Sequence, residues 1–201
     1  MDLATAVRAA QGGDEEAFRV LYRTVQPQLL QYVRTFVGAA DAEDVASEAW
    51  LQIARDLPGF RDTGATDTGD AIRGWTARIA RNRALDHLRA VGRRPIAAGG
   101  VEELIDRPGG QDTAEEAVAA VGTGRALAAI ASLPRDQAEA VLLRVVMGLD
   151  SKSAADVLGK RPGAMRMATS RGLRRLAELL EYDGGVSSVT FSVSRTLEDM
   201  R

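Results

Sequence analysis

The chain has 201 residues, 45% of them hydrophobic, which is enough for two small domains or one large one. It contains no cysteine, which excludes disulfides, thiolate zinc sites and cysteine nucleophiles and fits a reducing compartment. No apolar run approaches the roughly 18 residues of a membrane span, and the first residues lack a signal-peptide pattern. We therefore expect a cytoplasmic protein without membrane insertion.

The formal net charge of −2 hides a strong segregation of charge along the chain. Residues 72–94 contain seven arginines and one aspartate, a net charge of +6 with histidine neutral. Residues 99–117 carry −5, and residues 160–175 return to +6 without any acid. Two basic regions flank an acidic connector, and this pattern favours nucleic-acid binding in spite of the acidic total.

Helical periodicity dominates the sequence, so we predict an all-α protein. A first long helix begins after Asp14, which is placed to be its N-cap, and Pro27 is expected to kink or split it. A second helix opens at Asp41, with Asp44 three residues later in an arrangement similar to a capping box. It ends at Pro58 and the glycine that follows.

A loop rich in glycine, threonine and aspartate, residues 60–70, leads to a third helix over residues 72–89. That helix combines apolar residues at helical spacing with five arginines. Trp75 lies on its apolar stripe, so we assign it to the core rather than to base stacking. His87, the only histidine, has no metal-ligand or catalytic pattern around it and is assigned to the surface or the core.

The segment 95–124 is rich in proline, glycine and acidic residues and is predicted to be a flexible acidic linker. A second helical unit follows, in which "LPRDQAEAVLLRVVMGLD" forms a helix that ends at Gly148. A short helix over 151–158, a tight turn at Gly159 and a longer helix from about Pro162 then give a helix-turn-helix. The predicted divisions of the chain are 1–94, 95–124, 125–181 and a C-terminal extension, 182–201.

The last helix separates apolar from basic residues, as a helix that enters the major groove requires. One face carries Met165, Thr169, Gly172, Leu173, Leu176 and Leu180, and the outward face carries Arg166, Ser170, Arg171 and Arg174. In the C-terminal extension, Val189, Phe191 and Val193 alternate with polar residues as an edge strand would. Such a tail is either disordered or binds a regulator by strand addition.

Two separate stretches resemble the extracytoplasmic-function group of bacterial sigma factors, the promoter-recognition subunits of RNA polymerase. "DAEDVASEAWLQIARDLPGF" and "IRGWTARIARNRALDHLRAVGRRP" are similar to the second conserved region of that family, and "LPRDQAEAVLLRVVMGLDSKSAADVLG" with "SRGLRRL" is similar to the fourth. The resemblance covers residues 14–94 and 125–180. It implies a region 2 helical bundle and a region 4 helix-turn-helix, with no catalytic residue, metal or cofactor.

The resemblance also implies partners: core RNA polymerase, through its β′ clamp and β flap, promoter DNA and an anti-sigma factor. The residues it assigns to polymerase binding are Asp41, Asp44, Glu48 and Gln52. The alternative is that these carboxylates serve as an N-cap and a solvated helix surface, which for Asp41 alone is the better fit. The acidic linker is either a mimic of nucleic-acid charge in the polymerase or an ordinary solvated tether.

The same resemblance implies a set of DNA-binding residues. In the first unit these are Arg61, Arg78, Arg81, Asn82, Arg83, Asp86 and Arg89, with the loop 60–70 expected to capture a flipped base. In the second unit they are Lys160, Arg161, Arg166, Ser170, Arg171 and Arg174. The sequence departs from the family at Ala154, at Met167 and Ala168, and at Thr169, which leaves its base preference open.

Two other functions are compatible with parts of the sequence. Asp41, Asp44 and Glu48 could hold a divalent metal in a nuclease, although no second carboxylate cluster or general base accompanies them. The second unit alone could act as a helix-turn-helix repressor without polymerase. Because the first unit places arginines on a surface instead of forming an apolar ligand pocket, the sigma-factor interpretation is preferred.

Overall fold

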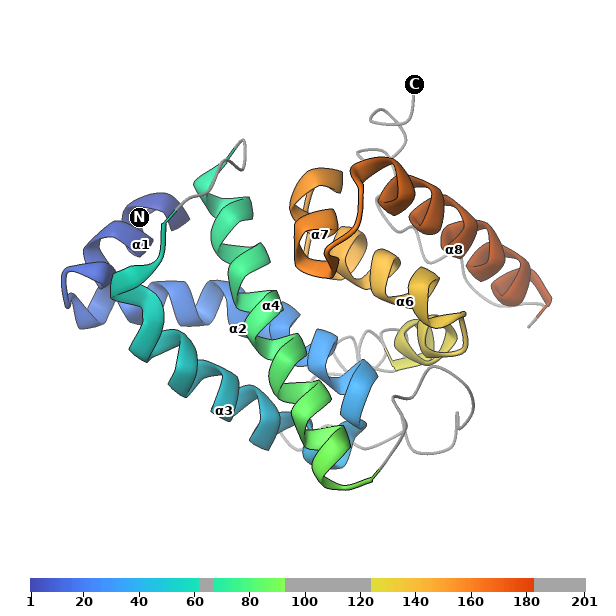
Figure 1. The fold of residues 1–201 in the computed structure, drawn as a ribbon, viewed down its shortest axis with the longest axis horizontal. Helices are drawn as coiled ribbons and strands as arrows, with labels where there is room; N and C mark the ends of the chain where they lie inside the picture. Colours follow the sequence, from blue (N-terminus) through green and yellow to red (C-terminus); the bar gives the residue numbers. More distant parts are fainter. Residues whose placement is uncertain (62–66, 93–123, 183–201) are drawn as a thin grey trace, which may run out of the picture.

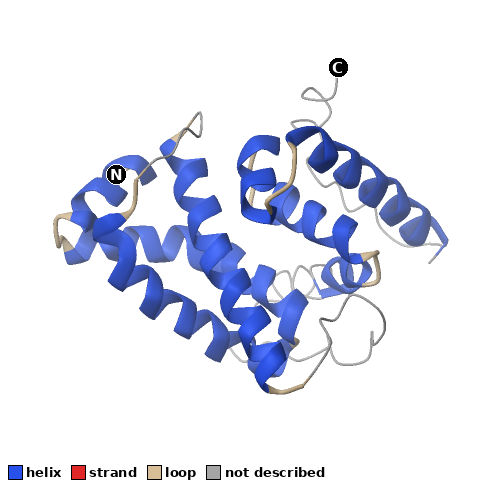
Figure 2. Ribbon diagram, in the orientation of Figure 1, coloured by secondary structure: helices blue, strands red, loops and turns tan. Residues whose placement is uncertain are grey.

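A computed structural model describes residues 1–61, 67–92 and 124–182. All regular elements in these ranges are helices, so the predicted all-α class is confirmed (Figure 2). The expected linker and the expected strand of the C-terminal extension lie outside the described residues.

The N-terminal unit is a bundle in which four α-helices pack around an apolar core. Its elements are α1 (Leu3–Gln11), α2 (Glu15–Val37), α3 (Ala39–Asp56), the short 3₁₀ helix η1 (Leu57–Gly59) and α4 (Thr68–Ala90). Helices α2, α3 and α4 all contact one another, and α1 packs on α2 and α4 (Figure 1).

Helix α2 begins where the sequence predicts, because the side chain of Asp14 accepts a hydrogen bond from the backbone N–H of Ala17 at 3.0 Å. Of the two expected effects of Pro27, a split of the helix is wrong, since α2 runs unbroken from Glu15 to Val37, and a kink stays a prediction. An interior proline costs about 3 kcal/mol. The neighbouring Val25 and Leu29 are fully buried, and burying each such side chain contributes about 1.5–3 kcal/mol, which offsets that cost.

Helix α3 begins earlier than predicted. Gly38, with a φ of 84°, occupies its N-cap position and makes no side-chain cap hydrogen bond, so Asp41 is not the N-cap. Asp41 lies in the first turn, and its Oδ2 is 3.1 Å from Nε2 of His87 on α4. The prediction failed because glycine at positive φ starts the helix without a polar cap.

Helix α1 was not predicted. The sequence of this helix offers only a short pattern. Asp2 caps it by accepting a hydrogen bond from the N–H of Thr5 at 2.9 Å, and three small apolar side chains face the bundle. The Nε2 of Gln11, its last residue, donates to the carbonyls of Leu57 and Phe60 at 3.1 and 2.8 Å. Helix α1 therefore fixes the backbone at Phe60.

The C-terminal unit has the predicted helix-turn-helix. After a helical segment at residues 124–131 come α6 (Arg135–Val141), the π-helical turn η3 (Leu142–Val146), α7 (Ser151–Leu158) and α8 (Pro162–Tyr182). Gly148 and Gly159 have φ values of 67° and 64°, left-handed conformations that end the preceding helices at little cost.

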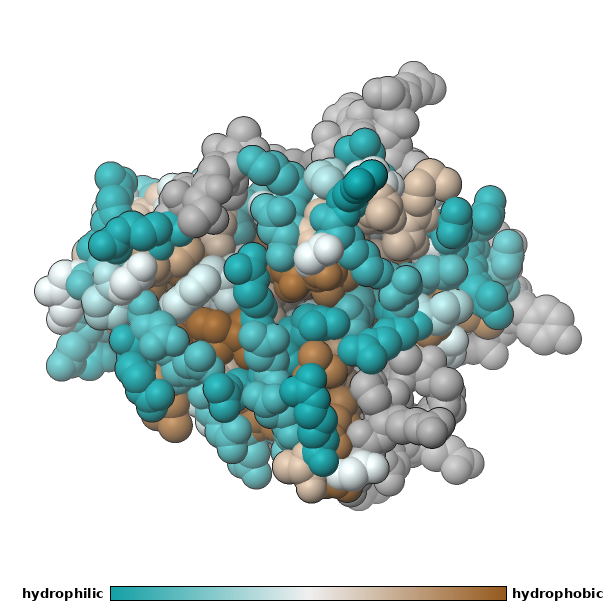
Figure 3. All heavy atoms as spheres, viewed as in Figure 1, coloured by the Kyte–Doolittle hydropathy of each residue, from teal (hydrophilic) through white to brown (hydrophobic). Residues whose placement is uncertain are grey.

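The two units touch each other. Helix α7 lies against α4, and η3 against α2, so segments more than 60 residues apart in the sequence lie side by side (Figure 1). The buried apolar side chains of both units belong to one continuous cluster. On the face in Figure 3, hydrophilic side chains cover most of the surface and apolar patches are small.

Candidate nucleic-acid interface

Helix α8 is held by one buried face. Met165, Thr169 and Leu176 are buried, and the hydroxyl of Thr169 donates a hydrogen bond to the carbonyl of Met165 at 3.0 Å. A Cβ added to Gly172 would lie 2.7 Å from Cγ2 of Val141. This glycine therefore allows α8 to pack closely on α6, which fixes the direction in which the opposite face points.

The opposite face of α8 is basic, as the sequence predicts. Arg166, Arg171 and Arg174 are exposed there, as is Arg161 just before the helix. Ser170 and Lys160 are half-buried, and Nζ of Lys160 lies 3.0 Å from Oδ1 of Asp136 on α6. Leu173, expected on the buried face, is only half-buried, and the side chain of Leu180 lies outside the described residues.

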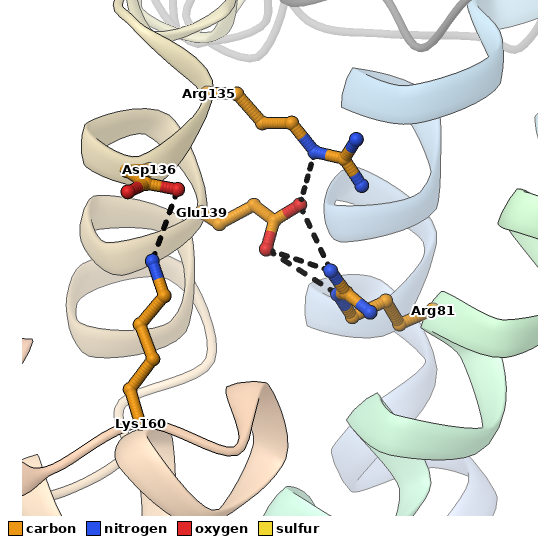
Figure 4. Close-up of polar contacts among 5 residues, drawn as sticks. All are labelled: Arg81, Arg135, Asp136, Glu139 and Lys160. Carbon is orange, nitrogen blue, oxygen red and sulfur yellow. Dashed lines mark hydrogen bonds and ion pairs between the residues drawn. The ribbon is translucent and has the colours of Figure 1, made fainter.

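Two arginines of α4 point toward the C-terminal unit. Nη2 of Arg78 donates to the carbonyl of Asp156 on α7 at 3.2 Å. Arg81 donates from Nε and Nη2 to the carboxylate of Glu139 on α6, at distances of 3.1–3.3 Å (Figure 4). Both arginines belong to the predicted DNA-binding set, and both are engaged by the second unit here.

Arg78 is itself exposed, whereas Arg81 and Arg83 are half-buried. Asn82, Asp86 and Arg89 are exposed, and Nη1 of Arg89 lies 2.7 Å from Oδ1 of Asp86. Arg61 is also exposed and donates to the carbonyl of Phe60 at 3.2 Å.

Glu139 is the centre of a buried polar cluster between the units (Figure 4). Its side chain is 6% exposed. The carboxylate accepts a hydrogen bond from Nε of Arg135 at 2.9 Å, in addition to those from the two donor nitrogens of Arg81. Tyr32 of α2 lies fully buried beside this cluster, and its hydroxyl has no hydrogen-bond partner among the described residues. Burial, and then the charge of Glu139, raise the pKa of Tyr32, which stays neutral.

A cavity of about 670 Å³ opens between the end of α3, α4 and α7. Phe60 and Trp75 line it with their ring centroids 5.2 Å apart and their planes at 51°, next to Arg55 and Arg78. Trp75 is half-buried, so it both packs on the core, as predicted, and contributes to the cavity wall. Asp156 of α7 completes the wall. An aromatic surface flanked by arginines can stack a base and neutralise a phosphate.

The outer face of α3 is acidic. Asp44 and Glu48 are exposed, and the neighbouring Leu51 is 68% exposed. Gln52 instead faces α4, where its Oε1 accepts from Nε of Arg83 at 2.9 Å. The predicted polymerase-binding set therefore divides: Asp44 and Glu48 are exposed, while Asp41 and Gln52 form hydrogen bonds with side chains of α4. Exposed carboxylates around a leucine suit a basic protein partner.

Asp70, in the first turn of α4, carries an unfavourable charge. Burial, and next the charge of Asp150 at the start of α7, raise the pKa of Asp70 above its ordinary 3.8, although Nη1 of Arg73 lies 3.3 Å away. At a pH above both the raised and the ordinary pKa the carboxylate is ionised in the folded and the unfolded chain, so folding must desolvate it. Between the raised and the ordinary pKa the folded chain binds the extra proton, and stability rises as the pH falls.

We therefore expect Asp70→Asn to raise the melting temperature at pH 7 and to lose that gain near pH 3, where the wild-type carboxyl is neutral in both states. Thermal unfolding followed by circular dichroism at both pH values measures this. Asp86→Asn, on the same helix but exposed, is the control and should change little. A lower melting temperature for Asp70→Asn at pH 7 would contradict the assignment.

Glu139 is not among the residues predicted from the sequence, although one sequence signal points to it. Glu139 falls at helical spacing on the apolar stripe that continues through Leu142 and Leu143. A charged side chain on an apolar stripe is buried only when it is paired with a group of opposite charge or a hydrogen-bond partner. Arg135 can be recognised from the sequence as a partner of Glu139, because it is four residues earlier on the same helix. Arg81 lies 58 residues away and could be identified as a partner only from the fold.

The described residues also bear on a metal site and on membrane insertion. Among the described residues, no three acidic or histidine side chains gather closely enough to hold a metal ion, so Asp41, Asp44 and Glu48 do not converge. None of the described helices combines the length and apolar character needed to cross a bilayer.

Comparison with known proteins finds two family models that match separate parts of the chain. Residues 21–94 match the family model of Sigma-70 region 2, and residues 123–176 match that of Sigma-70 region 4. The chain is similar to the ECF RNA polymerase sigma factor SigD of Mycobacterium tuberculosis, with 32% identity over 88% of this chain and 82% of SigD. It is 32% identical to the ECF RNA polymerase sigma factor ShbA of Streptomyces griseus, over 89% of this chain and 95% of ShbA.

The fold is similar to that of a solved sigma factor, RpoE from Bartonella quintana, in complex with the anti-sigma factor NepR. The TM-score is 0.60 at 22% identity, over 83% of this chain and 98% of that one. This likeness supports the fold of the two helical units.

Proposed function

Because the chain belongs to the extracytoplasmic-function family of bacterial RNA polymerase sigma factors, we propose that its two helical units divide promoter recognition between them. The protein directs RNA polymerase in transcription initiation. Its C-terminal unit, residues 125–181, reads the upstream promoter element, and its N-terminal unit, residues 1–94, binds core polymerase and opens the downstream element.

The observation that carries this proposal is the orientation of α8. Its buried stripe packs on α6, so that Arg166, Arg171 and Arg174 face solvent together. Residues near the N-terminus of such a helix reach base edges in the major groove, and arginine is the side chain best suited to guanine. Met167, which is 54% exposed between them, supplies an apolar contact rather than a basic one.

We expect Arg166→Ala and Arg171→Ala to weaken binding of the polymerase complex to its promoter. An arginine that reads guanine is worth about 1–3 kcal/mol at one base position, whereas a phosphate contact weakens binding to all sequences alike. Binding to a series of single-base promoter variants separates the two. Arg175→Ala, which removes the same charge nearer the C-terminal end of α8, is the matched control. Unchanged affinity in both test variants would remove α8 from this role.

For the N-terminal unit, the cavity lined by Phe60 and Trp75 supports capture of an unstacked base, and the arginines of α4 support contacts to the single strand. The exposed carboxylates of α3 support docking on a basic surface, which the family resemblance assigns to the β′ clamp. The C-terminal unit is assigned to the β flap on the same ground.

A protein regulator is part of this proposal. The related RpoE was solved with an anti-sigma factor, and we propose that this chain also has an anti-sigma partner. Extracytoplasmic-function sigma factors are non-enzymatic initiation factors, so we assign no catalytic residue and no cofactor. We place the chain in the cytoplasm, where the polymerase works.

Transcription from genomic fragments tests the proposal. Core polymerase with the protein should produce discrete run-off transcripts that are absent with core polymerase alone. If the protein adds no transcript and instead blocks transcripts made by a different holoenzyme, the chain acts as a repressor and the proposal is wrong.

A further inference from the structure

Helix α8 presents a long apolar side chain to solvent on the face that the proposed function assigns to the major groove. Met167 is 54% exposed, whereas Met165, two residues earlier, is fully buried. Ala168 and Leu173 of the same helix pack against the apolar core, but Met167 does not belong to that cluster. Packing among the described residues therefore gives no reason for a methionine here. A single exposed apolar residue is common on protein surfaces, so its place on the helix decides its meaning.

Met167 lies in the part of α8 that a groove-reading helix uses. The helix begins at Pro162, which places Met167 in its second turn. Residues in the first turns of the second helix of a helix-turn-helix contact base edges. Met167 follows Arg166 directly and precedes Arg171 by four residues, the spacing of neighbours on a helix surface, and both arginines are exposed. The methionine thus stands among the side chains proposed to read the upstream element.

The surface next to Met167 is formed by small residues. Gly163 and Ala164 precede it by four and three residues on the same side of α8, and both are exposed. Because neither has a side chain beyond Cβ, the first turn can approach base edges closely. Among the exposed residues of the described range 162–169, Met167 alone has a long apolar side chain. It is therefore the apolar group of this surface that reaches farthest into a groove.

The chemistry of methionine limits what it can recognise. Its thioether donates no hydrogen bond and is a weak acceptor, so it does not read the donor and acceptor pattern of a base edge. In the major groove, the apolar group on the base edges is the C5-methyl of thymine, which is read by apolar contact. Cytosine, the other pyrimidine, presents an amino donor there instead. An exposed methionine on this face of α8 therefore favours thymine.

We propose that Met167 determines specificity for one thymine of the upstream promoter element by contacting its C5-methyl group. The proposal rests on the proposed function of α8. The chain departs from its family at Met167, so this preference belongs to this chain rather than to the family as a whole. Arg166 and Arg171 can contact guanine or phosphate, and Met167 adds the thymine at a neighbouring position.

Deoxyuridine tests this contact, because it pairs as thymine does and lacks only the C5-methyl group. Footprinting of the polymerase complex on a promoter obtained by run-off transcription first locates the upstream element. Each thymine of that element is then replaced singly by deoxyuridine, and binding of the complex is measured by competition. At one position we expect the wild-type complex to bind about fourfold more weakly, which corresponds to the burial of one methyl group.

The variant Met167→Ala shows whether this residue senses the methyl group. It should bind the thymine and deoxyuridine promoters with equal affinity, so that the effects of the two changes are not additive. Met167→Leu keeps an apolar side chain of similar size and should retain the discrimination. Leu179→Ala removes a 41% exposed apolar side chain near the other end of α8. It is the matched control and should leave the difference between the two promoters unchanged.

Two results would overturn the proposal. One is an upstream element in which no thymine is sensitive to deoxyuridine, and the other is a sensitivity that persists undiminished in Met167→Ala. In both cases the proposed function stands if Arg166→Ala and Arg171→Ala still weaken promoter binding. If wild-type protein with core polymerase yields neither a run-off transcript nor a footprint, the proposed function itself fails, and the role of Met167 with it.

Discussion

The double charge reversal Asp44→Arg with Glu48→Arg is expected to lower the affinity for core polymerase at least about 100-fold, or about 2.7 kcal/mol. Both carboxylates are exposed on α3, next to the exposed Leu51. Placing like charges against a basic partner surface costs several kcal/mol. The folded structure should tolerate the change, because both positions are on the surface.

Fluorescence anisotropy of labelled protein titrated with core polymerase measures this loss, and circular dichroism verifies the fold. Glu43→Arg is the control for the single variant Glu48→Arg. Glu43 is exposed on the same helix but lies about 100° around its axis from Asp44. Equal effects of the two single variants would indicate general electrostatics rather than a docking face on α3.

Met165→Ala should lower the free energy of unfolding by about 2–5 kcal/mol, the range for truncating a fully buried methionine. Met165 is 0% exposed on the inner face of α8. Met167, two residues later and 54% exposed, provides a control in which the same atoms are removed from the opposite face. Met167→Ala should change stability by less than about 0.5 kcal/mol.

Urea denaturation followed by circular dichroism compares the two variants. If Met167→Ala destabilises the protein as much as Met165→Ala does, the assignment of faces on α8 is wrong, and with it the outward direction of Arg166 and Arg171. Because DNA recognition depends on that direction, the stability experiment also tests the site.

The local features of the fold could be predicted from the sequence because short-range chemistry determines them. Asp14 caps α2, and Gly159 turns between α7 and α8 at the expected place. The predictions of the start of α3 and of a break at Pro27 were wrong because a neighbouring residue outweighed the local sequence preference. Gly38 starts α3 without a polar cap, and the burial of Val25 and Leu29 outweighs the cost of Pro27.

The candidate site could be predicted only in part, since the sequence identifies residue types but not partners distant along the chain. The exposed arginines of α8 follow from helical periodicity. The pairing of Arg81 with Glu139, of Arg83 with Gln52 and of His87 with Asp41 depends on how the helices cross. Spacing along one helix cannot reveal such contacts.

Footprinting of promoter DNA with the protein alone, with core polymerase alone and with both together tests the central claim most directly. We predict that neither component alone protects the promoter, because the free protein has no partner that holds its two recognition surfaces on separate promoter elements. Both components together should protect an upstream and a downstream promoter element and should separate the DNA strands at the downstream element. Full protection of both elements by the protein alone would contradict a polymerase-dependent sigma factor.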